Sequence, residues 1–219
     1  MTGAIAVFVK TPKLSPVKTR LAASIGEEKA LEFYHLAVDA VKERIESAKD
    51  QMQGELEPYF AVAEKDGCNH DLWRSFKAIH TGEGGLGERM YNIYQGLLSK
   101  YGFVLLVGAD SPQLSPDVIL KAAKQLSENK GIVIGPASDG GFYLFGGNTP
   151  VPKDIWINVP YSQNNTLEIL LNNINNLCDV SFLDTYTDVD EVDDLELILK
   201  EMPFDLSKTQ AKLKEWILK

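Results

Sequence analysis

Four cations lie close together in the segment that follows the first apolar run of the chain. That run is AIAVFV, residues 4–9, and the segment KTPKLSPVKTRL after it contributes Lys10, Lys13, Lys18 and Arg20 to a chain whose net charge is −9. Lysine and arginine side chains beside the backbone N–H groups of a helix start can bind phosphate. A solvated basic turn remains an alternative, whereas a Walker A loop is excluded because the G-K-[ST] core is missing.

An aspartate follows the most strongly apolar run, FVLLVG at residues 103–108. Asp110 stands in the motif GADSP, two residues past the end of that run. Magnesium in proteins is held by one or two carboxylates, with substrate phosphates and water completing its shell. We therefore expect Asp110 to bind a metal or ligand rather than to cap the next helix, because Ser111 and Ser115 can also cap.

A third candidate carboxylate, Asp139, precedes the pair Gly140-Gly141 in the segment GPASDGGFYLFG. Glycine pairs allow a tight turn and a close approach of the backbone to a ligand. Asp-Gly is also a common hairpin turn. From the pattern alone the hairpin is favoured.

Two further aspartates alternate in the segment TDVDEVDDL near the C-terminus. Asp188 and Asp190 would share one face of an extended chain and could reach a metal. Helix capping by Asp190 is the alternative, and without other observations it is favoured, because acidic residues stabilise a helix N-terminus.

A glycine-rich segment, TGEGGLG, supports a competing hypothesis. Its glycines at positions 82, 84 and 87 match the dinucleotide-binding pattern G-x-G-x-x-G, with Asp110 ending the next strand. However, the run FKAIH before it is a weak strand, and Asp110 lies farther past the last glycine than the pattern usually places its acidic residue. The unit is also not the first strand–helix–strand unit of the chain. Dinucleotide binding is therefore the weaker hypothesis.

These residues must be positioned by strands that alternate with helices. We predict strands at 4–9, 58–63, 76–80, 103–108, 131–135, 142–146 and 179–183. Amphipathic periodicity predicts helices over 30–45, 90–98, from Ser115-Pro116 onward, and near 166–177, 190–201 and 207–218. Residues 148–165 are expected to form a long loop. This alternation predicts one α/β domain, residues 1–219, in three layers around a mixed, mainly parallel sheet. Ligands bind such sheets outside the carboxyl ends of the strands.

Composition narrows the possible partners and compartment. The negative net charge disfavours nucleic acid as a main partner. Cys68 and Cys178 are far apart in sequence, and the three histidines have no metal or nucleophile spacing. The start of the chain is too short and too plain for a signal peptide or a membrane span. We therefore expect a cytoplasmic protein without a disulfide framework or covalent catalysis.

Five blocks in this order resemble a bacterial family of glycosyltransferase-like proteins. The blocks are KTPKLSPVKTRLA, GEGGLGERM, VGADSPQLSPDVI, GPASDGGFYLFG and TDVDEVDDL, which together span nearly the whole chain. Members are described as radical-SAM/selenodomain-associated transferases, some of them linked to arsenosugar biosynthesis. The family is similar in fold to the GT-A nucleotide-diphospho-sugar transferases and to the nucleotidyltransferases of molybdenum-cofactor and coenzyme F420 biosynthesis.

The resemblance implies roles for individual residues. It assigns metal binding to Asp110 and to Asp188 or Asp190, and places the DGG-x-Y block, with Asp139 as an acceptor-orienting or proton-accepting group, near the acceptor. The implied substrate-binding residues are Lys10, Thr11, Pro12, Lys18, Thr19, Arg20, Gly84, Gly87, Arg89, Ala109, Gly140, Gly141, Tyr143 and Tyr161. Gly85, Glu88 and Met90 complete a family block of unassigned role. Ser111 stands where the family commonly has cysteine, and Tyr161-Ser162 where it often has Trp-Ser.

The leading hypothesis is glycosyl transfer from a nucleotide-diphospho-sugar to a small-molecule acceptor, with Mg²⁺ or Mn²⁺ at Asp110. Lys18 would stabilise the leaving group, and the loop 148–165, with Trp156 and Tyr161, would close over the acceptor. Nucleotidyl transfer from a nucleoside triphosphate to a phosphorylated molecule, and a non-catalytic nucleotide-binding regulator, stay open. The sequence also leaves open the sugar, the base, the acceptor and the stereochemical outcome. The oligomeric state is open as well, with a homodimer as one option.

Overall fold

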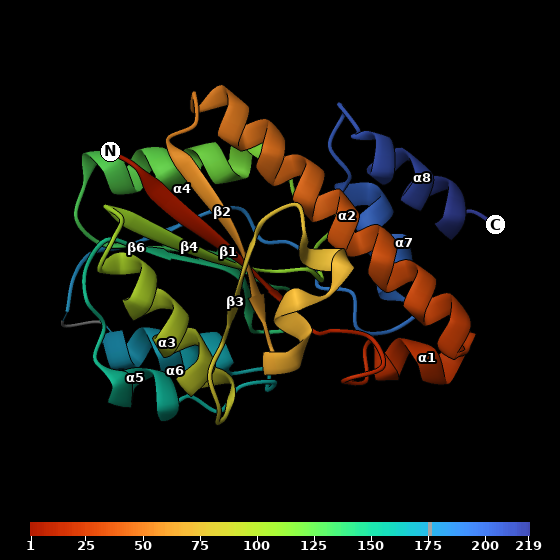
Figure 1. Ribbon diagram of the computed structural model, residues 1–219, viewed down its shortest axis with the longest axis horizontal. Coiled ribbons are helices and arrows are strands. Elements are labelled where there is room, and N and C mark those ends of the chain that lie inside the picture. Colours follow the sequence, from red (N-terminus) through yellow and green to blue (C-terminus); the bar gives the residue numbers. More distant parts are fainter. Residues whose placement is uncertain (175–176) are drawn as a thin grey trace.

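A single seven-stranded sheet organises the protein. The computed structural model describes residues 1–174 and 177–219 (Figure 1). The order of the strands across the sheet is β3-β2-β1-β4-β6-β5-β7. Their bounds are β1 Gly3–Val9, β2 Leu56–Val62, β3 Lys77–His80, β4 Phe103–Gly108, β5 Ile132–Pro136, β6 Phe142–Gly147 and β7 Val180–Phe182.

The sheet is mainly parallel, as predicted. Strands β3, β2, β1 and β4 pair in parallel, β6 runs antiparallel to both β4 and β5, and β5 pairs in parallel with β7. The strands other than β6 therefore point the same way, and their carboxyl ends meet at one edge. The loops after β1, β2, β4 and β5 all begin at this edge.

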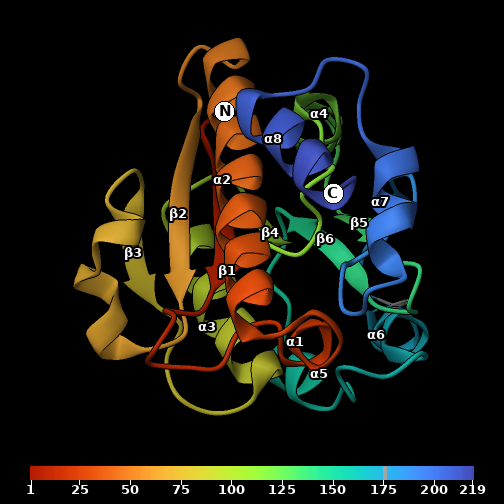
Figure 2. The same ribbon diagram turned by 90° about the vertical axis from the view of Figure 1, so that its right-hand side faces the viewer.

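Helices cover both faces of the sheet. Their bounds are α1 Thr19–Ile25, α2 Glu27–Gln51, α3 Leu86–Leu98, α4 Pro116–Glu128, α5 Lys153–Ile157, α6 Thr166–Ile174, α7 Asp194–Glu201 and α8 Lys208–Ile217. Helices α2 and α4 cover one face, and α3, α5 and α6 cover the other (Figures 1 and 2). The first two pack on the sheet through residues such as Ile45 and Ile119, and the other three through Ile93, Trp156 and Leu170. The three-layer prediction is confirmed.

A third apolar cluster extends one of these layers. Leu21 of α1, Ile198 of α7 and Leu213 of α8 pack around Phe33 of α2. This cluster ties the C-terminal helices to the start of α2, close to the segment that carries the four cations. In the described part of the chain, no helix is long and apolar enough to span a bilayer.

Local chemistry explains where several helices begin. Ser115 and Pro116 start α4, as predicted, although the Ser115 side chain forms no capping hydrogen bond. At α3 the Glu88 carboxylate accepts the Gly85 N–H at 2.9 Å, and at α8 the Ser207 hydroxyl accepts the Gln210 N–H. These contacts pair backbone donors that a helix start leaves without partners.

Two predictions about secondary structure need correction, and two short turns were missed. The segment 148–165 contains the short helix α5, because Trp156 packs into the core against Phe145 with ring centroids 4.7 Å apart. The helix expected near 190 begins only at Asp194. Two 3₁₀ turns, Lys65–Asn69 and Asp71–Trp73, were not predicted. The helix expected over 166–177 is present as α6, but residues 175 and 176 lie outside the described residues.

Candidate functional site

A cavity of about 880 Å³ opens at the carboxyl edge of the sheet. Its floor is formed by the ends of β1, β2 and β4, and its walls come from the cationic segment, the β5–β6 turn and two loops near Tyr161 and Asp188. This is the position at which ligands bind open α/β sheets. The expectation that the cationic segment and Asp110 share a hollow is therefore met.

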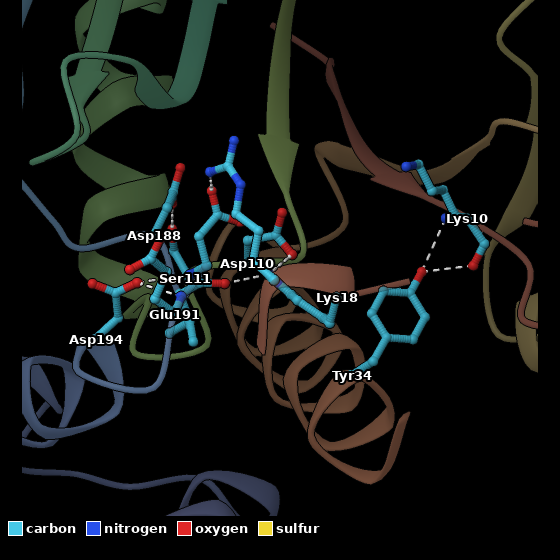
Figure 3. A network of polar contacts seen from close by, with 11 residues as sticks. Lys10, Lys18, Tyr34, Asp110, Ser111, Asp188, Glu191 and Asp194 are labelled. Carbon is cyan, nitrogen blue, oxygen red and sulfur yellow. Dashed lines mark hydrogen bonds and ion pairs between the residues drawn. The ribbon is translucent and has the colours of Figure 1, made fainter. Parts of the chain in front are cut away.

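Lys18 and Asp110 are in direct contact inside this cavity. The Lys18 Nζ lies 2.6 Å from Asp110 Oδ1 and donates to the Val189 carbonyl at 2.5 Å (Figure 3). The Lys18 side chain is only 5% exposed, whereas that of Asp110 is 45% exposed. Lys18 itself adopts a left-handed backbone, with φ of 48°, immediately before α1. Strained backbone of this kind costs about 1–3 kcal/mol and often marks functional sites.

The loop around Asp188 is joined to the loop around Asp110. The Val189 N–H donates to the Asp110 carbonyl at 3.0 Å, and the buried Ser111 hydroxyl donates to Asp188 Oδ1 (Figure 3). Burial raises the pKa of Asp188 to about 7, with the negative charge of Asp110 as the second cause. Two carboxylates therefore face one partly dehydrated space, and Ser111 hydrogen-bonds one of them.

The other predicted cations of the first loop are held in different ways. Arg20 Nη1 pairs with Asp190 Oδ2 at 2.8 Å, with both groups largely exposed. Asp190 is thus an ion-pair partner rather than a helix cap, since α7 begins four residues later. Lys10 lines the cavity, and its backbone is fixed by the Tyr34 hydroxyl, which accepts the Lys10 N–H at 2.9 Å and donates to the Lys10 carbonyl at 2.7 Å (Figure 3).

Two residues of the predicted phosphate loop lie outside the cavity. The Thr11 side chain is fully buried, and its hydroxyl accepts the Trp73 indole N–H at 3.1 Å. Pro12 borders a separate hollow of about 580 Å³ behind the loop, next to α1 and α2. The prediction of direct substrate contact is therefore wrong for Thr11, whereas for Pro12 it stays a prediction. Thr19, at the first position of α1, does line the cavity.

The glycine-rich segment before α3 has mainly a structural role. Gly84 and Gly87 do not line the cavity, and β3 before them is an edge strand of the sheet. A Cβ on Gly87 would lie 2.3 Å from the Trp156 carbonyl oxygen, so this glycine allows α3 to pack against α5. An edge strand is not where a dinucleotide-binding unit places its cofactor, which lies at a central switch point.

Arg89 lies in the same block but faces the cavity. Its guanidinium donates to the Gly84 carbonyl at 3.0 Å and to the Ala63 carbonyl at 2.9 Å. These bonds connect the end of β2 to the start of α3. Met90 also lines the cavity, while Glu88 completes the helix cap and Gly85 is its N-cap residue. The block therefore shapes one wall of the cavity mostly through packing and backbone bonds.

The segment around Asp139 is a hairpin, and it also borders the cavity. Strands β5 and β6 pair antiparallel, and the Asp139 Oδ1 accepts the Gly141 N–H at 2.8 Å within the turn. Gly140 has φ of +89°, and a Cβ there would lie 1.9 Å from the Asn164 carbonyl oxygen, so glycine is required. Asp139, Gly141 and Tyr143 line the cavity, whereas Gly140 sits behind it.

Of the two aromatic residues expected to cover an acceptor, one lines the cavity and the other is buried in the core. Tyr161 lines the cavity, and its hydroxyl donates to the Trp156 carbonyl at 3.0 Å. Trp156 is fully buried, so the prediction that it closes over an acceptor is wrong. Ala109, next to Asp110, lines the cavity as expected.

Glu64 is a site residue that sequence reasoning missed. It follows β2, lines the cavity and accepts the Thr11 N–H at 2.7 Å through Oε2. Its other oxygen, Oε1, is buried and has no hydrogen-bond partner among the described residues. A buried polar atom without a partner calls for an explanation, and a ligand donor is one. The only signal in sequence is its position two residues after a strand.

The carboxylates suit a divalent cation that a phosphate helps to hold. No group of three or more His, Cys, Asp or Glu side chains in residues 1–174 and 177–219 could hold a metal alone. Asp110 and Asp188, however, face the same space closely enough for the charge of one to raise the pKa of the other. Mg²⁺ commonly takes one or two carboxylates and fills its shell with phosphate oxygens and water. The donor set therefore fits Mg²⁺ or Mn²⁺ in the presence of a diphosphate.

Comparisons with known proteins agree with this geometry. Residues 45–163 match the profile of the family described as "Uncharacterized protein conserved in bacteria (DUF2064)". The chain belongs to this family. No curated protein matches the DUF2064 chain in sequence. The expected link to radical-SAM proteins or arsenosugars stays a prediction.

Solved structures place the DUF2064 chain in the nucleotide-diphospho-sugar transferase fold. A Desulfovibrio desulfuricans G20 protein, provisionally described as a nucleotide-diphospho-sugar transferase, matches with a TM-score of 0.84 and 26% identity, over 98% of this chain and 95% of its own. The 4-diphosphocytidyl-2C-methyl-D-erythritol synthase of Anaerococcus prevotii DSM 20548 matches with a TM-score of 0.56 and 11% identity, over 91% and 94%. The glucosyl-3-phosphoglycerate synthase of Mycobacterium tuberculosis, a complex with Mn²⁺, UDP and phosphoglyceric acid, matches with a TM-score of 0.52 and 9% identity, over 91% and 75%. The last two resemblances concern the fold alone.

Proposed function

We propose that this protein is a metal-dependent glycosyltransferase that uses a nucleotide-diphospho-sugar donor. One observation carries the proposal: a buried ammonium group from the loop after β1 meets a half-exposed carboxylate from the end of β4 inside one large cavity. This arrangement offers a cation for a diphosphate and an oxygen ligand for Mg²⁺ or Mn²⁺ at the same point. The match to the Desulfovibrio protein over nearly both full chains supports it.

The donor diphosphate would lie between the cationic loop and the two carboxylates. Lys18 and Arg20 would bind its oxygens, with Lys10 at the end of β1, while Asp110 and Asp188 would hold the metal. A bound divalent cation stabilises negative charge that develops on a leaving diphosphate. The Lys18 ammonium would add to that stabilisation because it is already fixed in place by the Val189 carbonyl. Glu64 Oε1 would accept a hydrogen bond from the nucleoside.

Asp139 is the candidate group for the acceptor hydroxyl. One of its oxygens is occupied by the Gly141 N–H, which fixes the carboxylate and leaves the other oxygen for a substrate. In the transfer, the acceptor oxygen bonds to the anomeric carbon and the bond from that carbon to the diphosphate breaks. The nucleoside diphosphate leaves with the electron pair, and the hydroxyl proton passes to Asp139.

Nucleotidyl transfer is the second candidate, because the cytidylyltransferase-type synthase from Anaerococcus shares the fold. The same loop and carboxylates would then bind a nucleoside triphosphate, and a phosphorylated molecule would attack the α-phosphorus. A nucleotide-binding regulator would bind nucleotide but turn over no acceptor. The three alternatives differ in their products.

A ligand screen followed by product analysis tests the proposal. Thermal unfolding is measured with UDP-, GDP- and ADP-glucose and with the four nucleoside triphosphates, each with and without Mn²⁺. We expect at least one nucleotide-sugar to raise Tm in a Mn²⁺-dependent way, and nucleoside diphosphate to be released when acceptors are added. Pyrophosphate release from a triphosphate would instead establish nucleotidyl transfer. Binding without any turnover would favour the regulator.

A further inference from the structure

One wall of the cavity differs from the rest in its chemistry. We call it the amide wall and define it by Asp139, Tyr161, Ser162, Gln163 and Asn164, all of which line the cavity. Its two segments are joined, because the Leu167 N–H donates to the Gly140 carbonyl at 2.9 Å and Gly140 packs directly against Asn164. The Thr166 hydroxyl donates to the Pro160 carbonyl at 2.8 Å and accepts the Gln163 N–H at 3.2 Å. The wall is therefore a fixed surface.

Three side chains of the amide wall are free for a ligand. Ser162, Gln163 and Asn164 are exposed, and their side chains form no hydrogen bond to another residue that the structure describes. An amide offers two donors and an acceptor, and a hydroxyl offers one donor and acceptor lone pairs. The aromatic ring of Tyr161 lies beside them with its own hydroxyl already bonded to Trp156. Mixed donors and acceptors next to an aromatic ring suit a molecule with several hydroxyl groups.

The charges around the cavity are already nearly balanced without a second anionic substrate. Four cations and five carboxylates line it: Lys10, Lys18, Arg20, Arg89, Glu64, Asp110, Asp139, Asp188 and Asp190. Lys18 and Arg20 each pair with an aspartate, and Arg89 binds backbone carbonyls. Within the described chain, the amide wall contributes no lysine or arginine, and its charged member is Asp139. A phosphate on the acceptor would add a charge of about −1.5 to −2 beside that carboxylate.

We infer that the acceptor is an uncharged, polyhydroxylated molecule bound by the amide wall. The inference rests on the proposed transferase function and specifies its second substrate. Sugars and nucleosides belong to this class, whereas sugar phosphates and phospho-acids do not. An unscreened phosphate against Asp139 would be repelled, and no cation on this wall would compensate.

Matched acceptor pairs test the inference. With the nucleotide-sugar that raises Tm most and with Mn²⁺, release of nucleoside diphosphate is compared for glucose and glucose 6-phosphate, for glycerol and glycerol 3-phosphate, and for adenosine and AMP. We expect transfer to an uncharged member, at least tenfold faster than to its phosphorylated partner. Preference for a phosphorylated member would overturn the inference, as would donor binding without transfer to any uncharged member. Failure of every nucleotide-sugar to bind would instead remove the proposed function and this inference with it.

Variants of the wall locate the acceptor. Asn164→Ala and Gln163→Ala should each raise the KM for the uncharged acceptor about 3- to 10-fold, the effect of one or two lost hydrogen bonds, with unchanged affinity for the donor. Asn165→Ala is the matched control, because Asn165 is an exposed neighbour that does not line the cavity. Asn164→Lys should improve use of the phosphorylated member of a pair. Equal effects of Asn164→Ala and Asn165→Ala would place the acceptor elsewhere and contradict the inference.

Discussion

The proline-containing segment after β1 and the glycine-rich segment before α3 both border the cavity, and they use their polar groups in opposite ways. In the first, Lys18 turns its ammonium into the cavity, where it contacts Asp110 at 2.6 Å. In the second, Glu88 and Arg89 hydrogen-bond backbone groups of their own loop, and Arg89 also bonds the end of β2. In this protein the glycine pattern therefore marks close packing, whereas ligand binding depends on which charged side chains reach the cavity.

Removing the Lys18 charge should have the largest effect. We expect Lys18→Met to weaken binding of the best nucleotide-sugar in Mn²⁺ by about 10- to 100-fold, the magnitude of a lost hydrogen bond between charged groups. Calorimetric titration measures this. Lys13→Met is the matched control, since Lys13 is an exposed cation of the same loop that lines only the hollow behind it. Similar losses of affinity in both variants would show that the loop attracts the ligand only through its overall positive charge.

Crowding the glycine-rich segment should lower stability next. A Cβ in Gly87→Ala would lie 2.3 Å from the Trp156 carbonyl oxygen and 2.9 Å from the Tyr161 ring. Overpacking of this kind costs about 1–3 kcal/mol, so thermal unfolding should begin several degrees lower. Gly96→Ala, in the same helix with nothing within 4 Å of its Cβ, should leave Tm unchanged or raise it. A Tm for Gly87→Ala equal to that of the wild type would show that α3 and α5 can move apart freely.

Arg89→Met tests whether Arg89 stabilises the fold or binds the ligand. The change leaves the carbonyls of Gly84 and Ala63 without this donor, which should cost about 1–2 kcal/mol of unfolding free energy. Denaturant titration measures the loss, with the exposed Arg74→Met as control. Affinity for the nucleotide-sugar should change less than threefold. A large loss of affinity at unchanged stability would show that Arg89 binds phosphate, contrary to the comparison.

The last expected effect concerns pH. The pKa of Asp188, about 7, lies above that of an ordinary carboxyl, so the folded protein binds a proton that the unfolded chain releases. The resulting stability is present at acidic pH and is lost as pH rises toward and through 7. In EDTA, Asp188→Asn should therefore gain in Tm relative to the wild type between pH 5 and pH 8. A constant difference across this range would mean that Asp188 stays ionised.

The sequence was sufficient for the sheet and for the position of the cavity. Apolar runs bounded by turn residues located each of the seven strands, and the rule for strand ends then singled out Lys18 and Asp110. Asp139 was assigned to the site through the family resemblance, because the local pattern favoured a hairpin. The rule works because parallel strands bring residues far apart in sequence to a common edge. Asp188 and Asp190 were recognised through the family resemblance, since local pattern favoured a helix cap.

The site predictions that failed concern residues whose positions depend on contacts between distant segments. Thr11 is withdrawn from the cavity because Trp73, in an unpredicted 3₁₀ turn, hydrogen-bonds its hydroxyl. Trp156 is buried because the segment around it forms a short helix against Phe145 and Tyr94. Glu64 was missed because a single glutamate after a strand has no local signature. None of these contacts leaves a periodic pattern in the sequence.

The central claim is that Asp110 helps to hold a metal-bound diphosphate beside Lys18. Its most direct test is calorimetric titration of the wild type and Asp110→Asn with the best nucleotide-sugar, with and without Mn²⁺. Asp154→Asn serves as control, because Asp154 is exposed and lies outside the cavity. We expect Mn²⁺ to strengthen binding at least tenfold in the wild type and in the control, and Asp110→Asn to abolish this gain. An Asp110→Asn variant that binds the nucleotide-sugar with the same Mn²⁺-dependent affinity as the wild type would contradict it.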